Sequence, residues 1–125
     1  MPVEPGLTAA IELTVGDVDT AASLRSGDVA MLGTPRVVAL VEEASVAALA
    51  GRLEPHVTSV GMRVQLDHLV PVPVGVKVRA EATLERVEGR RLNFTVSVNS
   101  ERGLVAAGKL TRVLVNRDRF VEKAQ

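Results

Sequence analysis

Three segments in the second half of the chain place an apolar residue at every second position, with charged or polar residues between them. This period of two is typical of β-strands that bury one face and expose the other. The predicted strands are residues 62–70, 76–85 and 91–99. A shorter alternation over residues 9–15 predicts a half-buried first strand.

The last apolar segment, Leu104 to Val115, is apolar on both parities and contains Gly108. A strand of this kind occupies the middle of a sheet or carries a bulge. The pairs Glu88-Gly89 and Arg102-Gly103 predict hairpin turns on either side of residues 91–99. We expect Arg117 to Gln125 to form a polar tail.

A helix is predicted from Thr34 to about Ala50, stopping at Gly51. Thr34 reads as its N-cap, and Pro35 occupies the first helical position, where the missing N–H costs nothing. Apolar residues recur at helical spacing and predict a buried stripe. The stripe is Val37, Val38, Val41, Ala44, Ala48 and Leu49. Residues 16–33, just before the helix, have turn chemistry and are expected to form a loop that folds back onto a pocket.

One long helix and five antiparallel strands predict an α+β fold in which the sheet wraps around the helix. The exposed edges of such a sheet would be buried by a symmetric homodimer that joins two sheets edge to edge. The 125 residues fit one domain, spanning residues 1–125.

Composition excludes several classes of function. The 15 basic residues cancel the 15 acidic ones, so net charge predicts neither nucleic-acid nor membrane binding. No cysteine is present, which excludes disulfides and thiolate sites and fits a cytoplasmic protein. We expect no signal peptide, no membrane-spanning helix, no metal and no cofactor.

Three residues carry candidate chemistry. The strand parity puts His68 on the apolar face, where an imidazole is either a hydrogen-bonded core residue or a catalytic base. Glu42 borders the buried stripe, whereas Glu43 points about 100° away, toward solvent. Thr34 has a structural role as N-cap, but its hydroxyl also lies beside the free N–H groups of a helix start, where an oxyanion is stabilised.

Other residues could contact a substrate without taking part in the chemistry. Gly61 would permit close approach of a ligand, or could simply mark a bulge. His56 lies in a polar loop and has no metal-ligand spacing around it. Several arginines could meet phosphates, although scattered arginines are more often solvated surface. They are Arg36, Arg52, Arg63, Arg90 and Arg91.

The chain resembles the hotdog-fold acyl-CoA thioesterases, and within them the fluoroacetyl-CoA thioesterase-like group. The resemblance covers roughly Met31 to Asn116. It rests on Gly33-Thr34-Pro35, on Glu42 and His68, which follow the threonine by eight and 34 residues, and on Gly61. Pro71-Val72-Pro73-Val74-Gly75 and Val87-Glu88-Gly89-Arg90-Arg91-Leu92 also match.

The resemblance implies a homodimer that hydrolyses an acyl thioester to a carboxylate and free coenzyme A. Thr34, Glu42 and His68 would be catalytic, and Gly61 would lie near the acyl group. We expect Gly61, Gly33 and Arg36 to bind the substrate. Glu42 would activate water or attack the carbonyl, or Thr34 would be the nucleophile. The fluoroacetate-specific enzyme carries aromatic gate residues before the threonine, and residues 16–33 contain none. A short or medium acyl chain is therefore expected.

Two other functions fit the same fold. A hotdog hydratase or dehydratase would act on an acyl thioester without releasing its thiol. A non-catalytic module would bind acyl-CoA or another small ligand and would keep its affinity after changes at Glu42 and His68.

Overall fold

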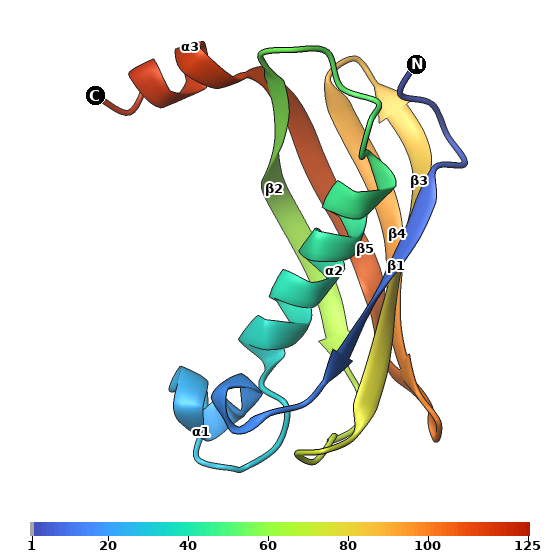
Figure 1. The fold of residues 1–125 in the computed structure, drawn as a ribbon, viewed down its shortest axis with the longest axis vertical. Coiled ribbons are helices and arrows are strands. Elements are labelled where there is room, and N and C mark those ends of the chain that lie inside the picture. Colours follow the sequence, from blue (N-terminus) through green and yellow to red (C-terminus); the bar gives the residue numbers. More distant parts are fainter. Residues whose placement is uncertain (1) are drawn as a thin grey trace.

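Five strands form one antiparallel sheet, and the helix α2 lies across its concave face (Figure 1). The computed structural model describes residues 2–125. The predicted long helix and five strands are confirmed. The strands are β1 (Thr8–Thr14), β2 (Val57–His68), β3 (Lys77–Glu88), β4 (Arg91–Ser100) and β5 (Gly103–Asn116). The helices are η1 (Asp17–Asp19), α1 (Ala21–Leu24), α2 (Thr34–Ala48) and α3 (Arg117–Glu122).

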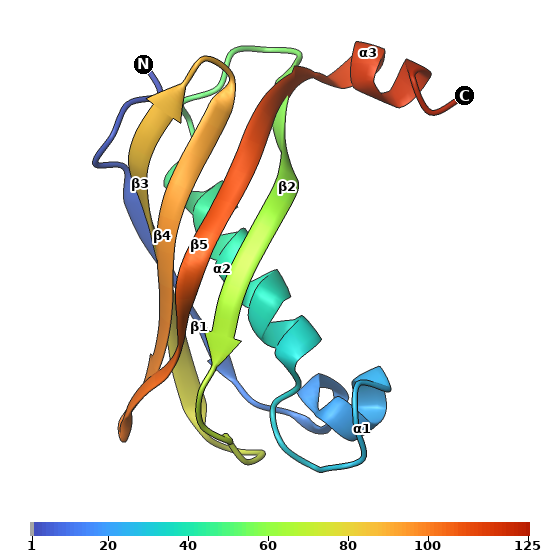
Figure 2. The same ribbon diagram turned by 180° about the vertical axis from the view of Figure 1, so that it is seen from behind.

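The strands follow the order β1-β3-β4-β5-β2, so β1 and β2 are the two edges of the sheet. The hairpins β3–β4 and β4–β5 turn where the sequence predicted them. Because α2 follows β1 and precedes β2, the chain crosses the concave face from one edge to the other (Figure 2). This crossing leaves β2, a strand of 12 residues, beside α2 with an unpaired outer edge.

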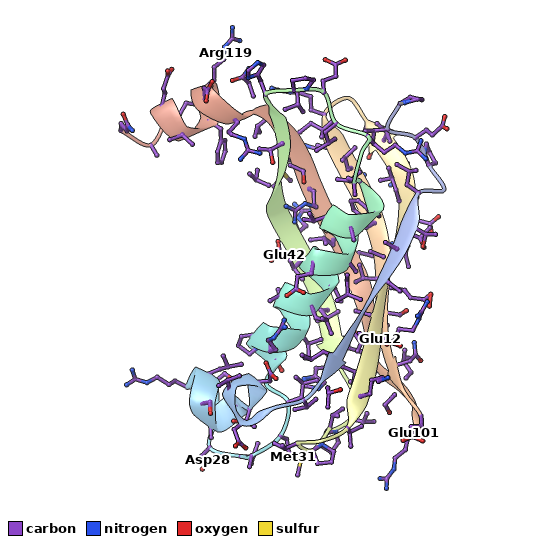
Figure 3. The ribbon with its side chains drawn as sticks, viewed as in Figure 1. Glu12, Asp28, Met31, Glu42, Glu101 and Arg119 are labelled. Carbon is purple, nitrogen blue, oxygen red and sulfur yellow. The ribbon has the colours of Figure 1, made fainter. Side chains whose placement is uncertain are left out.

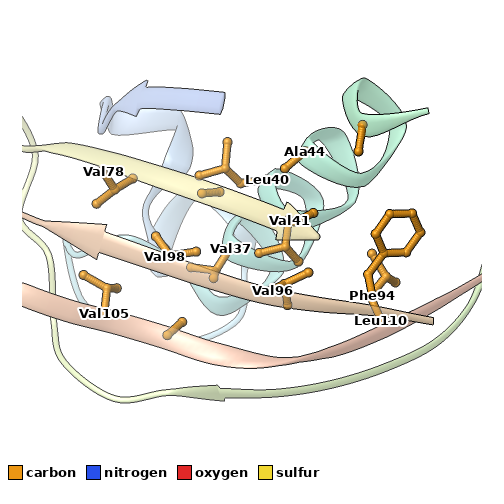
Figure 4. Packing of buried hydrophobic residues seen from close by; sticks show 14 of the residues in the cluster. Val37, Leu40, Val41, Ala44, Val78, Phe94, Val96, Val98, Val105 and Leu110 are labelled. Carbon is orange, nitrogen blue, oxygen red and sulfur yellow. The ribbon is translucent and has the colours of Figure 1, made fainter. Parts of the chain in front are cut away.

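The core lies between α2 and the sheet (Figure 4). The helix contributes Val37, Leu40, Val41, Ala44 and Ala48. The sheet contributes Val78, Ala80, Ala82, Leu84, Leu92, Phe94, Val96, Val98 and Leu110. Except for Leu110, the sheet residues are the predicted apolar faces of residues 76–85 and 91–99. The small side chains of Ala44 and Ala80 allow the helix and the sheet to approach closely. Within residues 2–125, no helix is long and apolar enough to cross a membrane.

A β-bulge in β2 changes which of its side chains face α2. Pairing with β5 slips between Gly61 and Arg63, so Met62 has no partner in the ladder. The prediction that Met62 shares a face with Val64, Leu66 and His68 is therefore wrong, and Met62 is exposed. Gly61 faces α2 in its place, although its parity differs from that of His68.

The start of α2 also differs from prediction. Gly33, not Thr34, is the N-cap, and Thr34 occupies the first helical position with Pro35 after it. Glycine can cap because its extended backbone brings its carbonyl to the N–H groups of Arg36 and Val37. The Thr34 hydroxyl is therefore not required for capping. The helix ends at Ala48, with Leu49 as C-cap, two residues before the predicted end.

Two segments have more structure than predicted. Residues 16–33 contain η1 and α1, and α1 is capped by the Thr20 hydroxyl, which accepts a hydrogen bond from the Ser23 N–H. The predicted polar tail begins with the helix α3, capped by the side chain of Asn116. Both helices are short and depend on a local side-chain cap that composition alone does not reveal.

Candidate active site

The Thr34 hydroxyl contacts the imidazole of His68, across 34 residues of sequence. Thr34 Oγ1 and His68 Nδ1 are 2.9 Å apart. Thr34 stands at the start of α2, and His68 ends β2, opposite Ala106 of β5. The close packing of α2 on the sheet brings these two ends together. A hydroxyl hydrogen-bonded to a histidine is the arrangement of a nucleophile with its base, or of a base held in position by a hydroxyl.

The second imidazole nitrogen has no partner. His68 Nε2 is buried and forms no hydrogen bond within residues 2–125. An unpaired buried polar atom costs about 1–3 kcal/mol of folding free energy. Both interpretations of His68 that the sequence leaves open, a hydrogen-bonded core residue and a catalytic base, agree with its one hydrogen bond through Nδ1.

A cavity of about 550 Å³ opens beside this pair. Residues 26–29 and 31–33 form one wall, and residues 69–71, which follow His68, form another. The side chains of Val29, Met31 and Leu32 line it, as do Leu69 and Val70. The prediction that residues 16–33 fold back onto a pocket is confirmed, and the lining can accommodate an aliphatic group.

The first turn of α2 supplies a free hydrogen-bond donor at the same place. The Gly33 N–H is occupied because it donates to the Asp19 carbonyl at 2.8 Å. In contrast, the Thr34 N–H donates no hydrogen bond within the described chain. Gly33 must be small here, since a Cβ would stand 3.0 Å from the Ala21 backbone. Gly33 thus lets the helix start approach α1, and the exposed N–H belongs to Thr34.

Glu42 belongs to a second group of residues, two turns along α2 (Figure 3). Arg112 Nη1 donates to Glu42 Oε2 at 3.2 Å. Gly61 lies opposite Arg112 in the β2–β5 ladder, and a Cβ on Gly61 would collide with the same carboxylate oxygen. The glycine therefore leaves room for Glu42 to extend along the sheet.

Arg112 was not predicted to belong to the site. Its side chain is only 8% exposed, and it donates from Nε to the Ser59 hydroxyl at 2.9 Å and from Nη2 to the Ser59 carbonyl at 3.0 Å. Burial lowers the pKa of the Arg112 guanidinium, and the Glu42 carboxylate opposes that shift. The sequence held a signal, because Arg112 is the only charged residue on the helix-facing parity of β5.

The two groups do not meet within one chain. Eight residues of helix separate Glu42 from Thr34 by roughly 12 Å. Seven residues of strand separate Gly61 from His68 by roughly 20 Å. Each group also borders its own cavity, and the one beside Glu42 and Arg112, of about 480 Å³, touches neither Thr34 nor His68.

Arg36 is already engaged by two carboxylates. Its Nε donates to Asp19 Oδ1 and its Nη1 to Glu43 Oε1, each at 3.0 Å. Asp19 is buried and also accepts from the Gly16 N–H at 2.8 Å. Arg36 therefore ties residues 16–19 to the first turns of α2. Glu43 is half exposed and points outward, as predicted.

Comparison with known proteins identifies the family. Residues 15–118 match the family model described as fluoroacetyl-CoA-specific thioesterase. The chain belongs to this family. The fluoroacetyl-CoA thioesterase of Streptantibioticus cattleyicolor is 33% identical over 95 residues, which cover 76% of this chain and 68% of that protein.

Solved structures of the fluoroacetyl-CoA thioesterase FlK have the same fold. One superposes with a TM-score of 0.93 at 27% identity, over 99% of this chain and 96% of that one. A thioesterase superfamily member from Thermus thermophilus gives 0.89 at 26% identity, over 97% and 90% of the two chains. The predicted hotdog fold and thioester hydrolase activity are thereby confirmed. No group of metal-ligating side chains occurs in residues 2–125.

Substitution of Gly61 tests whether the position of Glu42 matters. In Gly61→Ala the new methyl group displaces the Glu42 carboxylate, which is the end of a flexible side chain, so the fold tolerates the change. We expect thioester hydrolysis to fall at least about tenfold, because small misplacements of a catalytic group are costly. Thiol release and thermal melting measure the two effects.

Gly16→Ala is the matched control, since its Cβ would meet Asp19 Oδ2 at an ordinary 3.5 Å. Its activity should equal that of the wild type. Full activity of Gly61→Ala would show that the carboxylate need not lie against β2.

Proposed function

We propose that the protein is a homodimeric acyl-CoA thioesterase whose active site is assembled from two chains. The observation that carries this proposal is the division of the polar residues into two groups. Thr34 and His68 lie at one end of β2, whereas Glu42, Gly61 and Arg112 lie near its middle. Both groups lie along the open edge of β2. A second copy of the chain paired on this edge would bring the Glu42 group of one chain next to Thr34 and His68 of the other.

The bulge determines the register of that pairing. In an antiparallel pair, residues directly opposite share a face of the sheet. A two-fold axis at Gln65 pairs Val64 with Leu66 of the second copy, and both face α2. Beyond the bulged Met62, the same register puts Gly61 opposite His68 of the second copy. Glu42 of one chain then approaches the Thr34–His68 pair of the other.

The charges of β2 favour this register. Arg63 and Asp67 lie on the face away from α2, paired with Thr111 and Ala107 of β5. With the axis at Gln65, Arg63 stands opposite Asp67 of the second copy. The two-fold symmetry repeats the pair, so the interface gains two complementary ion pairs.

The proposed chemistry begins at the start of α2. The thioester carbonyl lies near the Thr34 N–H, where the helix N-terminus stabilises the oxyanion of the tetrahedral intermediate. His68 Nδ1 is positioned to take a proton from the Thr34 hydroxyl or to be held by it. Addition of the nucleophile to the carbonyl carbon forms that intermediate, the C–S bond then breaks, and the departing thiolate takes a proton. Water supplies the second carboxylate oxygen, either as the nucleophile itself or by hydrolysing the acyl-enzyme that Glu42 or Thr34 would form.

Glu42 contributes the carboxylate side chain of the proposed active site. Arg112 holds one of its oxygens by a charge-assisted hydrogen bond, and the side chain remains 35% exposed, so the other oxygen can face a ligand. Glu42 either activates the water or attacks the carbonyl, and Thr34 is the nucleophile in the alternative route. Rapid quenching followed by peptide mass spectrometry distinguishes the routes by the presence and place of an acyl group.

The acyl group is proposed to be a short or medium aliphatic chain. The 550 Å³ cavity is lined by Val29, Met31 and Leu32, and no aromatic side chain comes from residues 16–33. The carrier is proposed to be coenzyme A, because variants of FlK have been solved with CoA and fluoroacetate and with acetyl-CoA. The proposed reaction needs no resident cofactor, and a cysteine-free chain suits the cytoplasm.

Thiol release from a panel of acyl-CoAs tests the proposed roles. We expect Glu42→Gln and His68→Ala to lower kcat/KM by at least about a hundredfold, since each removes a group that moves a proton. His68→Ala should melt within a few degrees of the wild type, because it also removes an unpaired buried nitrogen. Unfolding of His68→Ala, or unchanged turnover in both variants, would contradict these roles.

A charge exchange tests the dimer register. Arg63→Asp places two carboxylates opposite each other on both sides of the axis, so the dissociation constant of the dimer should rise roughly tenfold. Adding Asp67→Arg restores opposite charges and should recover the affinity. Analytical ultracentrifugation measures both, and a double variant no tighter than Arg63→Asp alone would contradict the register.

A further inference from the structure

A second cavity, of about 500 Å³, lies between α3 and the end of the sheet. Its floor is apolar and comes from the face of the sheet away from α2. Its rim carries three cations and no carboxylate. The floor is Val60, Val113 and Val115, and the rim is Arg90, Arg119 and Lys123, with Phe120 between.

The three cations converge from different parts of the chain. Arg90 belongs to the β3–β4 turn, whereas Arg119 lies in α3 and Lys123, the C-cap of that helix, follows one helical turn later. None of them forms an ion pair within residues 2–125. The cations that do are Arg36, Lys77, Arg79, Arg86 and Arg112. In a chain of zero net charge, three cations that converge on one cavity with no carboxylate among its lining residues favour an anionic ligand.

Phe120 gives the cavity an exposed aromatic surface. The chain has two phenylalanines, and Phe94 is fully packed in the core at 2% exposure, whereas Phe120 is 45% exposed. An aromatic ring flanked by cations is the combination that binds a nucleotide, by stacking on the base and pairing with the phosphates.

Gly61 connects this cavity with the reaction site. It borders the cavity below α3 and also contacts the Glu42 carboxylate. In the proposed dimer the pairing of the two β2 strands ends at Gly61, because its partner His68 is the last residue of β2, so a ligand can pass from one face of the sheet to the other at the open edge just beyond Gly61. Both views show α3 projecting past the β2 edge, and Arg119 and Glu42 lie on this side of the molecule (Figures 2 and 3).

We propose that this cavity binds the phosphorylated adenine nucleotide of coenzyme A. Arg90, Arg119 and Lys123 pair with the phosphates, and Phe120 stacks on the adenine. The pantetheine arm passes the open edge beyond Gly61 to bring the thioester to Glu42. This assignment rests on the proposed function, and it names the part of the substrate that α3 recognises.

Two substrates with the same acyl group test the assignment, namely the acyl-CoA and the acyl-N-acetylcysteamine, which lacks the nucleotide. For Arg119→Glu combined with Lys123→Glu, KM for the acyl-CoA should rise at least about tenfold, because two favourable charges become repulsive. The kcat/KM for the N-acetylcysteamine thioester should stay unchanged. Arg102→Glu combined with Lys109→Glu, away from this cavity, is the matched control and should change neither constant.

Three results would overturn the assignment. Equal losses of kcat/KM on both substrates would place the effect of the substitutions at the reaction site. No loss on either substrate would show that the nucleotide does not bind in this cavity. Dissociation of the double variant into monomers would make α3 a subunit contact instead. If the wild type hydrolyses neither thioester, the proposed function fails, and calorimetric titration of free coenzyme A still tests the cavity by the same comparison of variants.

Discussion

A single extra residue in β2 determines which side chains of that strand meet α2. Because Met62 is bulged, Gly61 and His68 face the helix together although seven residues separate them. Without the bulge, one of the two would point to the opposite face of the sheet. Glu42 would then meet a side chain in place of an open glycine backbone. The division of the site and the register proposed for the dimer both depend on this bulge.

The helix gives the site its second constraint. The hydrophobic stripe fixes α2 on the sheet, and this fixes the positions of Thr34 at its start and Glu42 two turns later. A rigid helix cannot bring these residues closer, so one chain presents two incomplete groups. Each group also holds a buried polar side chain. His68 is paired through Nδ1 alone within residues 2–125, whereas Ser59 and Glu42 accept the hydrogen bonds of the Arg112 guanidinium.

Much of the fold could be predicted from the spacing of hydrophobic residues along the chain and from its composition. The alternation of apolar residues predicts the buried faces of β3 and β4, and their helical spacing predicts the buried stripe of α2, because burial of one face requires such a spacing. Gly61 was one signal of the bulge, but the change of face at Met62 could not be predicted, since Met62 is as apolar as its neighbours and continues their alternation. Thr34 was misplaced by one position because glycine also caps helices. Arg112 was overlooked because its partners, Ser59 and Glu42, are distant in sequence.

Subunit complementation shows whether two chains share one active site. His68→Ala and Glu42→Gln are each purified, mixed in equal amounts, dissociated and reassembled. Half of the dimers are then mixed, and each has one site that combines an intact His68 with an intact Glu42. If two chains share the site, we expect recovery of about a quarter of wild-type thiol release from two inactive variants. No recovery, with mixed dimers demonstrated by native mass spectrometry, would mean that each chain uses its own His68 and Glu42.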